Sequence, residues 1–164
     1  MRQIISLMIL SLALAGCQTV PDRSGFTPRQ VATLQQNGFE PVGDGWQFGM
    51  ADRLLFGSDE SVLIPAQHGV IGAMARTLVA VDINGARVEG HTDSTGTAAY
   101  NEALSLKRAQ AVADALGRGG MAPGALRVLG MGARVPVDSN RSADGRRENR
   151  RVVIIVSPTD AIRP

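Results

Sequence analysis

The stretch GHTDSTGTAAYNEALSLKRA, residues 90–109, is the most informative part of this 164-residue sequence. From residue 98 onward it is rich in alanine and leucine and lacks proline, which predicts a helix. One face of that helix carries a mostly apolar stripe that contains an arginine. The stripe consists of Asn101, Leu104, Ser105, Arg108, Val112 and Ala115. Burial of an unpaired guanidinium is costly, so we expect Arg108 to have an anionic partner in the fold or in a ligand.

Apolar patterns on both sides of this stretch predict alternating strands and helices. Trp46, Phe48 and Met50 alternate as in a strand. After Pro65, a helix of roughly 15 residues is expected from its apolar spacing. The apolar positions of that helix are Val70, Ile71, Met74, Leu78 and Val81. Further strands are expected at 86–90, 126–129 and 152–156, and a helix at 98–118. This order predicts an α/β sandwich, a mixed β-sheet with helices on one face.

The N-terminus has the pattern of an export signal. Arg2 precedes an uncharged, mostly apolar run, residues 4–14, which is too short to span a bilayer. The following LAGC resembles a bacterial lipobox, which implies acylation of Cys17 as the first residue of the mature protein. Cys17 is the only cysteine, so disulfides within the chain are excluded. An ordinary signal peptide with an incidental cysteine is the alternative. The residue after the cysteine is Gln18 and not aspartate. In this respect the chain resembles lipoproteins that are sorted to the periplasmic face of the outer membrane.

The charge balance argues against a nucleic-acid partner. The formal net charge is +2, and removal of residues 1–16 takes away one charge, that of Arg2, which leaves +1. The basic cluster near the C-terminus is interrupted by Asp144 and Glu148, so no large field of one sign remains. The mature chain of 148 residues (164 minus 16) has the length of one domain with a tether.

A short helix with complete end signals is expected before the first strand. Thr27 is placed as N-cap, Pro28 as first helical residue, and Gln30 completes a capping box. Asn37 and Gly38 offer a left-handed cap. Isolated helices shorter than roughly 12 residues are marginal in water, so this helix needs support from the rest of the chain.

Aromatic residues are concentrated in one segment. The only tryptophan and three of the four phenylalanines lie between residues 39 and 56. Core packing is one interpretation. The other is that Phe39, Trp46 and Phe48 contact a partner protein, because aromatic residues are favoured anchors at interfaces.

Three ordered blocks resemble the OmpA-like peptidoglycan-binding domain. The first is Phe56-Gly57 with Leu63 and Pro65, which matches the first strand and helix entry of that family. The second runs from Gly90-His91-Thr92-Asp93 to Arg108-Ala109, and the third is Gly145-Arg146 with Asn149-Arg150-Arg151. The chain then divides into a signal peptide (1–16), a region with acylated cysteine, linker and short helix (17–45), the OmpA-like domain (46–157) and a C-terminal tail (158–164).

The resemblance implies a pocket for the diaminopimelate of the cell-wall stem peptide. This residue has a free ammonium and a free carboxylate on one carbon. The family assigns Asp93 as ammonium acceptor and Arg108 as carboxylate clamp, whose planar fork can bind two oxygens. The other pocket residues implied are Thr92, Asn101, Leu104 and Arg150. In the empty pocket we expect Asp93 and Arg108 to pair with each other. A purely internal salt bridge between them is the alternative to a binding site.

The HTDS stretch, residues 91–94, has the residue types of a catalytic triad without its geometry. In a strand, His91 and Asp93 point to one side and the two hydroxyl residues to the other, so no relay forms. We expect His91 to satisfy a hydrogen bond at the strand end and His68 to lie on the surface. The sequence has no HExxH motif, cysteine pair or carboxylate cluster. The prediction is a non-enzymatic protein without metal or cofactor.

Segments across almost the whole mature chain resemble the YfiB-type outer-membrane lipoproteins of the YfiBNR signalling system. The matching segments are the lipobox, CQT, the short helix, NGFE, GWQFGM, LLFG and GRRENRRVVIIV. The resemblance implies capture of the periplasmic repressor YfiR, which frees the diguanylate cyclase YfiN to make cyclic di-GMP. The domain motifs alone leave a second function open, a Pal-type structural tether between outer membrane and peptidoglycan. A homodimer is also left open.

Overall fold

The β-branched run of residues 152–156 lies in the centre of a five-stranded sheet with strand order β1-β2-β5-β3-β4. The structure is a computed structural model that describes residues 25–56 and 61–161. The strands are β1 (Glu40–Val42), β2 (Gly45–Ala51), β3 (Ala86–His91), β4 (Leu126–Gly132) and β5 (Arg151–Val156). β3 and β4 are parallel and the other neighbours antiparallel, so the predicted mixed sheet is confirmed.

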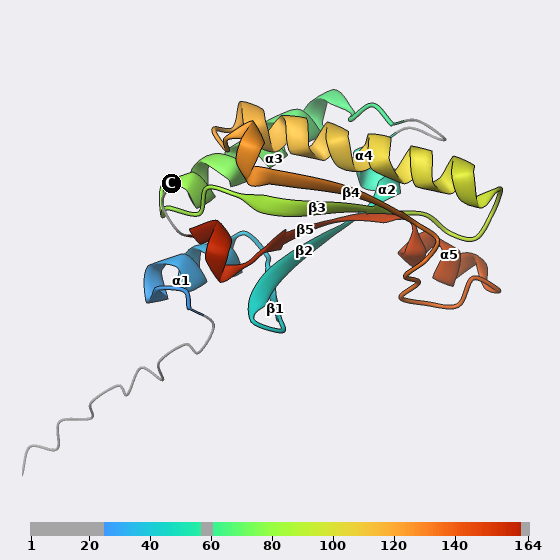
Figure 1. Cartoon of the computed structure of the whole chain (residues 1–164), viewed down its shortest axis with the longest axis horizontal. Helices are drawn as coiled ribbons and strands as arrows, with labels where there is room; N and C mark the ends of the chain where they lie inside the picture. Colours follow the sequence, from blue (N-terminus) through green and yellow to red (C-terminus); the bar gives the residue numbers. More distant parts are fainter. Residues whose placement is uncertain (1–24, 57–60, 162–164) are drawn as a thin grey trace, which may run out of the picture.

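Two long helices, α3 (Pro65–Val79) and α4 (Ala98–Arg118), lie on the same face of this sheet (Figure 1). Glycines allow α4 to approach the strands closely. A Cβ atom at Gly90 would collide with the carbonyl of Ser105, and one at Gly130 would lie 2.7 Å from the carbonyl oxygen of Glu102. Shorter elements are α1 (Pro28–Gln36), α2 (Asp52–Leu55), η1 (Pro123–Ala125), α5 (Ala143–Asn149) and η2 (Pro158–Ala161).

The apolar stripe of α4 is buried as the helical spacing predicts. Val112 and Ala115 have no exposed surface, and Arg108 is 4% exposed among them. Ile71, Met74, Leu78 and Val81 are also buried in the core, as predicted. Val70 lies in the predicted helix, but its side chain is 57% exposed on the outer side of α3.

The short helix α1 is part of the domain. The capping box between Thr27 and Gln30 forms as predicted. The Gln30 side chain also donates a hydrogen bond to the carbonyl of Val81 (3.0 Å), and Leu34 is fully buried. α1 thus packs on the domain expected at 46–157, and β1 extends the sheet of that domain by pairing with β2.

The expectation for Phe56 needs correction. Phe56 was assigned to the first strand, but it follows α2 and forms only an isolated bridge with Leu63. The strand of this region is β2, which ends at Ala51. The start of the C-terminal tail is attached to the domain, because the Asn84 amide donates to the carbonyl of Asp160 (3.0 Å).

The described chain begins at the end of the sheet opposite the carboxyl end of β3. Gly25 lies against Pro158, which follows β5, and β5 runs antiparallel to β3. Figure 1 accordingly shows α1 and α5 at opposite ends of the sheet. None of the helices in 25–56 and 61–161 is long and apolar enough to cross a membrane. The expected signal peptide and Cys17 lie outside these residues.

Candidate binding pocket

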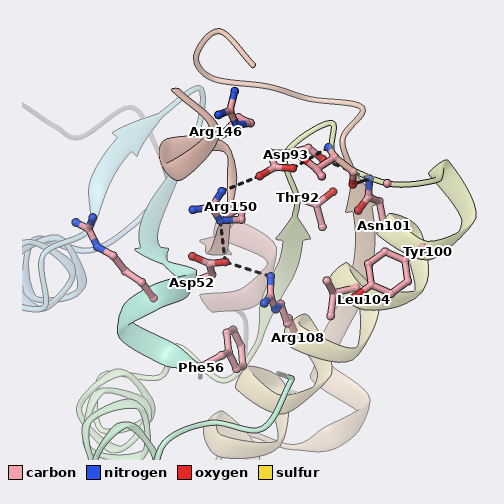
Figure 2. A pocket seen from close by; sticks show the side chains of 13 residues that line it. Asp52, Phe56, Thr92, Asp93, Tyr100, Asn101, Leu104, Arg108, Arg146 and Arg150 are labelled. Carbon is pink, nitrogen blue, oxygen red and sulfur yellow. Dashed lines mark hydrogen bonds and ion pairs between the residues drawn. The ribbon is translucent and has the colours of Figure 1, made fainter. Parts of the chain in front are cut away.

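A cavity of about 770 Å³ opens beyond the carboxyl end of β3. The loop after β3, the first turns of α4, α2 and the end of α5 contribute its walls (Figure 2). The lining residues are Asp52, Arg53, Phe56, Thr92, Asp93, Thr95, Gly96, Tyr100, Asn101, Leu104, Arg108, Arg146 and Arg150. All six residues that the sequence assigned to the pocket are therefore brought together in one cavity.

Asp93, in the loop after β3, lines the pocket. Its Oδ1 accepts a hydrogen bond from the Thr95 amide (2.8 Å), and its Oδ2 accepts one from Nη1 of Arg150 (2.7 Å). Burial by itself would raise the pKa of Asp93, but the hydrogen bonds from Arg150 and Thr95 outweigh it and the pKa is lowered. Asp93 is therefore a fixed, ionised acceptor.

Arg108 reaches the pocket from the buried face of α4. Its Nη1 lies 3.2 Å from Oδ2 of Asp52, and its guanidinium carbon lies 5.3 Å from the ring centroid of Phe56. An arginine over an aromatic face gains a cation–π attraction in addition to its ion pair. Asp52 is thus an anionic partner of the buried arginine.

The expected ion pair between Asp93 and Arg108 is wrong. Among the described residues, the ion pair of Arg108 is with Asp52, and that of Asp93 is with Arg150. The physical reason is the position of Arg150, which stands between the two carboxylates. Its Nε lies 3.3 Å from Oδ2 of Asp52, while its Nη1 binds Asp93. Figure 2 shows the resulting series Arg108, Asp52, Arg150, Asp93.

Asn101 and Thr92 line the pocket on either side of the Asp93 backbone contacts, but of these two described side chains only that of Asn101 is hydrogen-bonded there. The Asn101 amide donates hydrogen bonds to the carbonyls of Asp93 (3.3 Å) and Thr95 (3.0 Å) and so holds the loop against α4. The Thr92 hydroxyl is buried and has no hydrogen-bond partner among the described residues. Leu104 is half-buried on the wall formed by α4. Asn101 therefore acts through the loop, whereas Thr92 retains an unsatisfied hydroxyl.

Arg150 is held in position by the segment before β5. Asn149, which is fully buried, accepts hydrogen bonds from the amides of Val137 and Asp138 and donates to the carbonyl of Asp138. The Arg150 carbonyl accepts a hydrogen bond from the Asp52 amide (3.0 Å). The hydrogen bond to Asp93, together with the nearby Asp52, raises the pKa of Arg150 despite partial burial. Arg150 is therefore charged and anchored at its backbone.

His91 does not behave as expected. It is 2% exposed, and neither ring nitrogen has a hydrogen-bond partner among the described residues. Glu89 Oε2 lies 3.5 Å from its Nε2 without forming a hydrogen bond. Burial, with a smaller effect from Arg151, lowers the pKa of His91 to about 4. The expected hydrogen bond at the strand end is absent there, and His91 does not line the pocket.

The three aromatic residues assigned to a partner surface lie mainly in the core. Phe39 is 3% and Trp46 is 6% exposed, so neither presents a surface that a partner can contact in this conformation. Phe48 is half-buried and packs on Phe39 with ring centroids 5.5 Å apart. Core packing therefore describes Phe39 and Trp46 in this conformation, and contact of the three aromatic residues with a partner stays a prediction.

Asp52 is the functional candidate that the sequence analysis missed. It follows β2, and Ala51 pairs with Arg151, so this register places Asp52 beside Arg150. The available signal was the sequence ADRLL, residues 51–55. In it, an aspartate directly follows the alternating strand and shortly precedes two leucines. As to metals, the described part of the chain contains no cluster of three or more histidine, cysteine or carboxylate side chains.

Comparison with known proteins gives the family. The model of the OmpA family matches residues 55–150, more than half of the chain. The outer-membrane lipoprotein YfiB of Pseudomonas aeruginosa is 45% identical over 152 residues, which cover 93% of this chain and 90% of that protein. The peptidoglycan-binding protein ArfA of Mycobacterium bovis is 38% identical over 104 residues, which cover 63% of this chain and 32% of that protein.

Solved structures show the same fold. The cell wall anchor of the T6SS from Pseudomonas aeruginosa has a TM-score of 0.68 and 31% sequence identity, over 79% of this chain and 97% of that chain. This agrees with the mixed sheet and one-sided helices described above. The chain belongs to the OmpA family and, within it, to the YfiB-type outer-membrane lipoproteins.

Proposed function

We propose that this chain is a non-enzymatic receptor of the cell envelope with two ligands. Its pocket binds the diaminopimelate of peptidoglycan stem peptides. The protein also captures a YfiR-like periplasmic repressor, which relieves inhibition of the diguanylate cyclase YfiN and raises cyclic di-GMP. Acylation of Cys17 anchors it at the periplasmic face of the outer membrane.

The observation that carries the pocket assignment is the series of alternating charges around one cavity. Asp93 supplies an ionised acceptor, and Arg108 supplies a buried guanidinium. A zwitterion needs one anion and one cation in the same pocket. Charge-assisted hydrogen bonds to both groups make such recognition stronger than neutral contacts. The charges therefore suit an amino acid with a free ammonium and a free carboxylate.

Ligand binding is an exchange of partners at Asp93. In the empty pocket Oδ2 of Asp93 binds Arg150, whereas Oδ1 is engaged by the backbone of Thr95. The ligand ammonium replaces Arg150 at Oδ2, so Asp93 remains paired with a cation. Arg150 keeps its Nε contact with Asp52 and turns its free nitrogens toward the ligand carboxylate beside Arg108. No buried charge is left unpaired in this exchange.

The similarities support the two halves of the proposal differently. ArfA is named a peptidoglycan-binding protein, and the solved neighbour is a cell wall anchor. These names favour a wall ligand. The signalling role rests on the match to YfiB over almost the whole chain, including α1 and the β1–β2 hairpin outside the OmpA match. A Pal-type structural tether remains the competing function, because it needs the same pocket.

Sedimentation with purified sacculi tests the pocket. We expect Asp93→Ala and Arg108→Ala to abolish co-sedimentation, since each removes one of the two charges that the ligand requires. Asp114→Ala and Arg118→Ala are matched controls, because these residues lie on the outer side of α4, away from the pocket. Undiminished sedimentation of both pocket variants, with folding confirmed by circular dichroism, would reject the site.

Co-purification of the repressor tests the signalling role. The full-length, membrane-anchored protein should retain a YfiR-like protein from periplasmic extract, and its expression should raise cyclic di-GMP. A tether has no need of this repressor. Wild-type sedimentation with sacculi, combined with no repressor capture and unchanged cyclic di-GMP, would establish the Pal-type alternative.

A further inference from the structure

Asp52 lies where the two basic side chains of the pocket meet. Its Oδ2 is 3.2 Å from Nη1 of Arg108 and 3.3 Å from Nε of Arg150. These arginines come from α4 and from the end of α5, which are far apart in the sequence. One carboxylate oxygen therefore joins both guanidinium groups (Figure 2).

The backbone fixes the position of this carboxylate. The Asp52 amide donates to the carbonyl of Arg150 (3.0 Å), and the Asp52 carbonyl accepts from the amide of Phe56 (2.8 Å). The residue is 8% exposed. An acceptor with so little freedom loses little entropy when it orients the two arginines.

Asp52 also sets the charge that a ligand meets. Among the described lining residues there are four arginines, Arg53, Arg108, Arg146 and Arg150, and two aspartates, Asp52 and Asp93. Asp52 offsets one of the two cations that it contacts. When the ligand ammonium engages Asp93, Asp52 remains as a counter-charge beside both arginines.

We propose that Asp52 is a positioning residue that makes the pocket selective for a zwitterion over an anion without an ammonium group. This inference rests on the proposed binding of diaminopimelate. Asp52 holds Arg150 by its Nε, so that Arg150 can leave Asp93 when the ligand ammonium arrives. Asp52 also limits the positive charge that would attract ligands with carboxylates alone.

The loss of the Asp52 charge should weaken binding of the ligand ammonium and strengthen attraction of anions. In Asp52→Asn, Arg150 has one carboxylate partner fewer and binds Asp93 more strongly, so the ligand ammonium meets more competition. At the same time, the net charge around Arg108 and Arg150 becomes more positive by one, so the pocket attracts anions better. Affinity for the zwitterion should fall, and the preference for an ammonium should fall with it.

The experiment uses two tripeptides that differ by one ammonium. One is L-Ala-γ-D-Glu-meso-diaminopimelate, and the other carries 2-aminopimelate instead, so that the distal ammonium is absent. Isothermal titration gives the affinity of both for wild type, Asp52→Asn, Asp52→Glu and the exposed control Asp114→Asn. We expect Asp52→Asn to lose at least about tenfold in affinity for the first tripeptide. This is the size of effect that the loss of one hydrogen bond to a charged group typically has.

The ratio of the two affinities separates selectivity from structure. It should fall in Asp52→Asn and stay near the wild-type value in Asp52→Glu, which keeps the charge, and in Asp114→Asn. An unchanged ratio in folded Asp52→Asn would overturn the inference, whatever the absolute affinity. Absence of binding by the wild type would instead reject the proposed function.

A measurement on the unaltered protein keeps the inference testable if Asp52→Asn does not fold. The Nε–H proton of Arg150 should exchange slowly with solvent by NMR in both the free and the tripeptide-bound protein, because Asp52 holds it in both states. Rapid exchange in either state would contradict the role of Asp52.

Discussion

The two ends of the sheet are stabilised by different interactions. At the carboxyl end of β3, buried charges pair across α2, α4, α5 and the loop after β3. At the opposite end, α1 is attached by Leu34, by Phe39 packing on Phe48, and by side-chain hydrogen bonds of Gln30 and of its C-cap Asn37. The pocket end therefore depends on the identity of a few charged groups, whereas the α1 end depends on buried apolar area.

This difference gives the two ends different sensitivities. Apolar packing is lost when volume is removed, and it responds weakly to pH. A network of charges and a buried neutral histidine responds to protonation. The predictions below use this contrast, from the largest expected effect to the smallest.

Removal of the buried side chain of α1 should have the largest effect. Leu34 has no exposed surface, and truncation of such a leucine costs about 3 kcal/mol of unfolding free energy. Leu34→Ala should therefore lower the urea midpoint of the whole domain, with Gln35→Ala, on the exposed side of α1, as control. Tripeptide binding should persist. If the global midpoint is unchanged, α1 unfolds separately and is not part of the cooperative domain.

Acid should destabilise the protein through His91 before it affects the carboxylates. The folded pKa of His91 is lowered from 6.5 to about 4, so the unfolded state binds the extra proton and stability falls as pH decreases through this window. The total loss is about 3 kcal/mol, because one pKa unit corresponds to about 1.4 kcal/mol. Asp93, whose pKa is lowered below the usual range of an aspartate, acts only at lower pH.

The replacement His91→Phe isolates this effect. Phenylalanine keeps an aromatic ring and removes the two nitrogens that lack partners. In urea titrations between pH 6.5 and about 4, the variant should lack the part of the stability loss that comes from protonation of His91. The same pH slope in the variant and the wild type would assign the acid sensitivity to residues other than His91.

Loss of the α1 cap should have a smaller effect. The Thr27 hydroxyl accepts a hydrogen bond from the Gln30 amide (3.3 Å) and closes the capping box. Thr27→Ala should cost about 1 kcal/mol. Hydrogen exchange should show faster exchange in the first turn of α1, with the pocket unaffected. Equal protection of that turn in both proteins would show that tertiary packing alone holds it.

Thr92→Val should have the smallest effect on stability. Valine replaces a buried hydroxyl that has no described partner by a methyl group of similar volume, so the unfolding free energy should change little or rise. If the ligand satisfies this hydroxyl, tripeptide affinity falls while stability does not. A clear loss of stability would mean that the hydroxyl is satisfied within the free protein.

The same contrast explains what the sequence could predict. Helical spacing is a local property, and it placed Arg108 on the buried face of α4. The end signals of α1 are local as well, and they predicted its caps. The family motif identified the pocket residues because each motif position corresponds to one residue type with one role in the pocket.

The pairing within the pocket could not be predicted in this way. Asp52 meets Arg150 because Ala51 is in register with Arg151, and antiparallel register is a tertiary property. Without it, Asp93 was the nearest candidate partner for Arg108. Burial of Phe39 and Trp46 was also ambiguous, since aromatic residues are favoured both in cores and at interfaces.

The most direct test of the account is the structure of the domain with L-Ala-γ-D-Glu-meso-diaminopimelate bound. We predict that the distal ammonium lies within hydrogen-bond distance of Asp93 Oδ2, that the carboxylate on the same carbon contacts Arg108, and that Arg150 has left Asp93 but still contacts Asp52. A ligand bound outside this cavity, or one whose carboxylate and ammonium contact neither Arg108 nor Asp93, would contradict it.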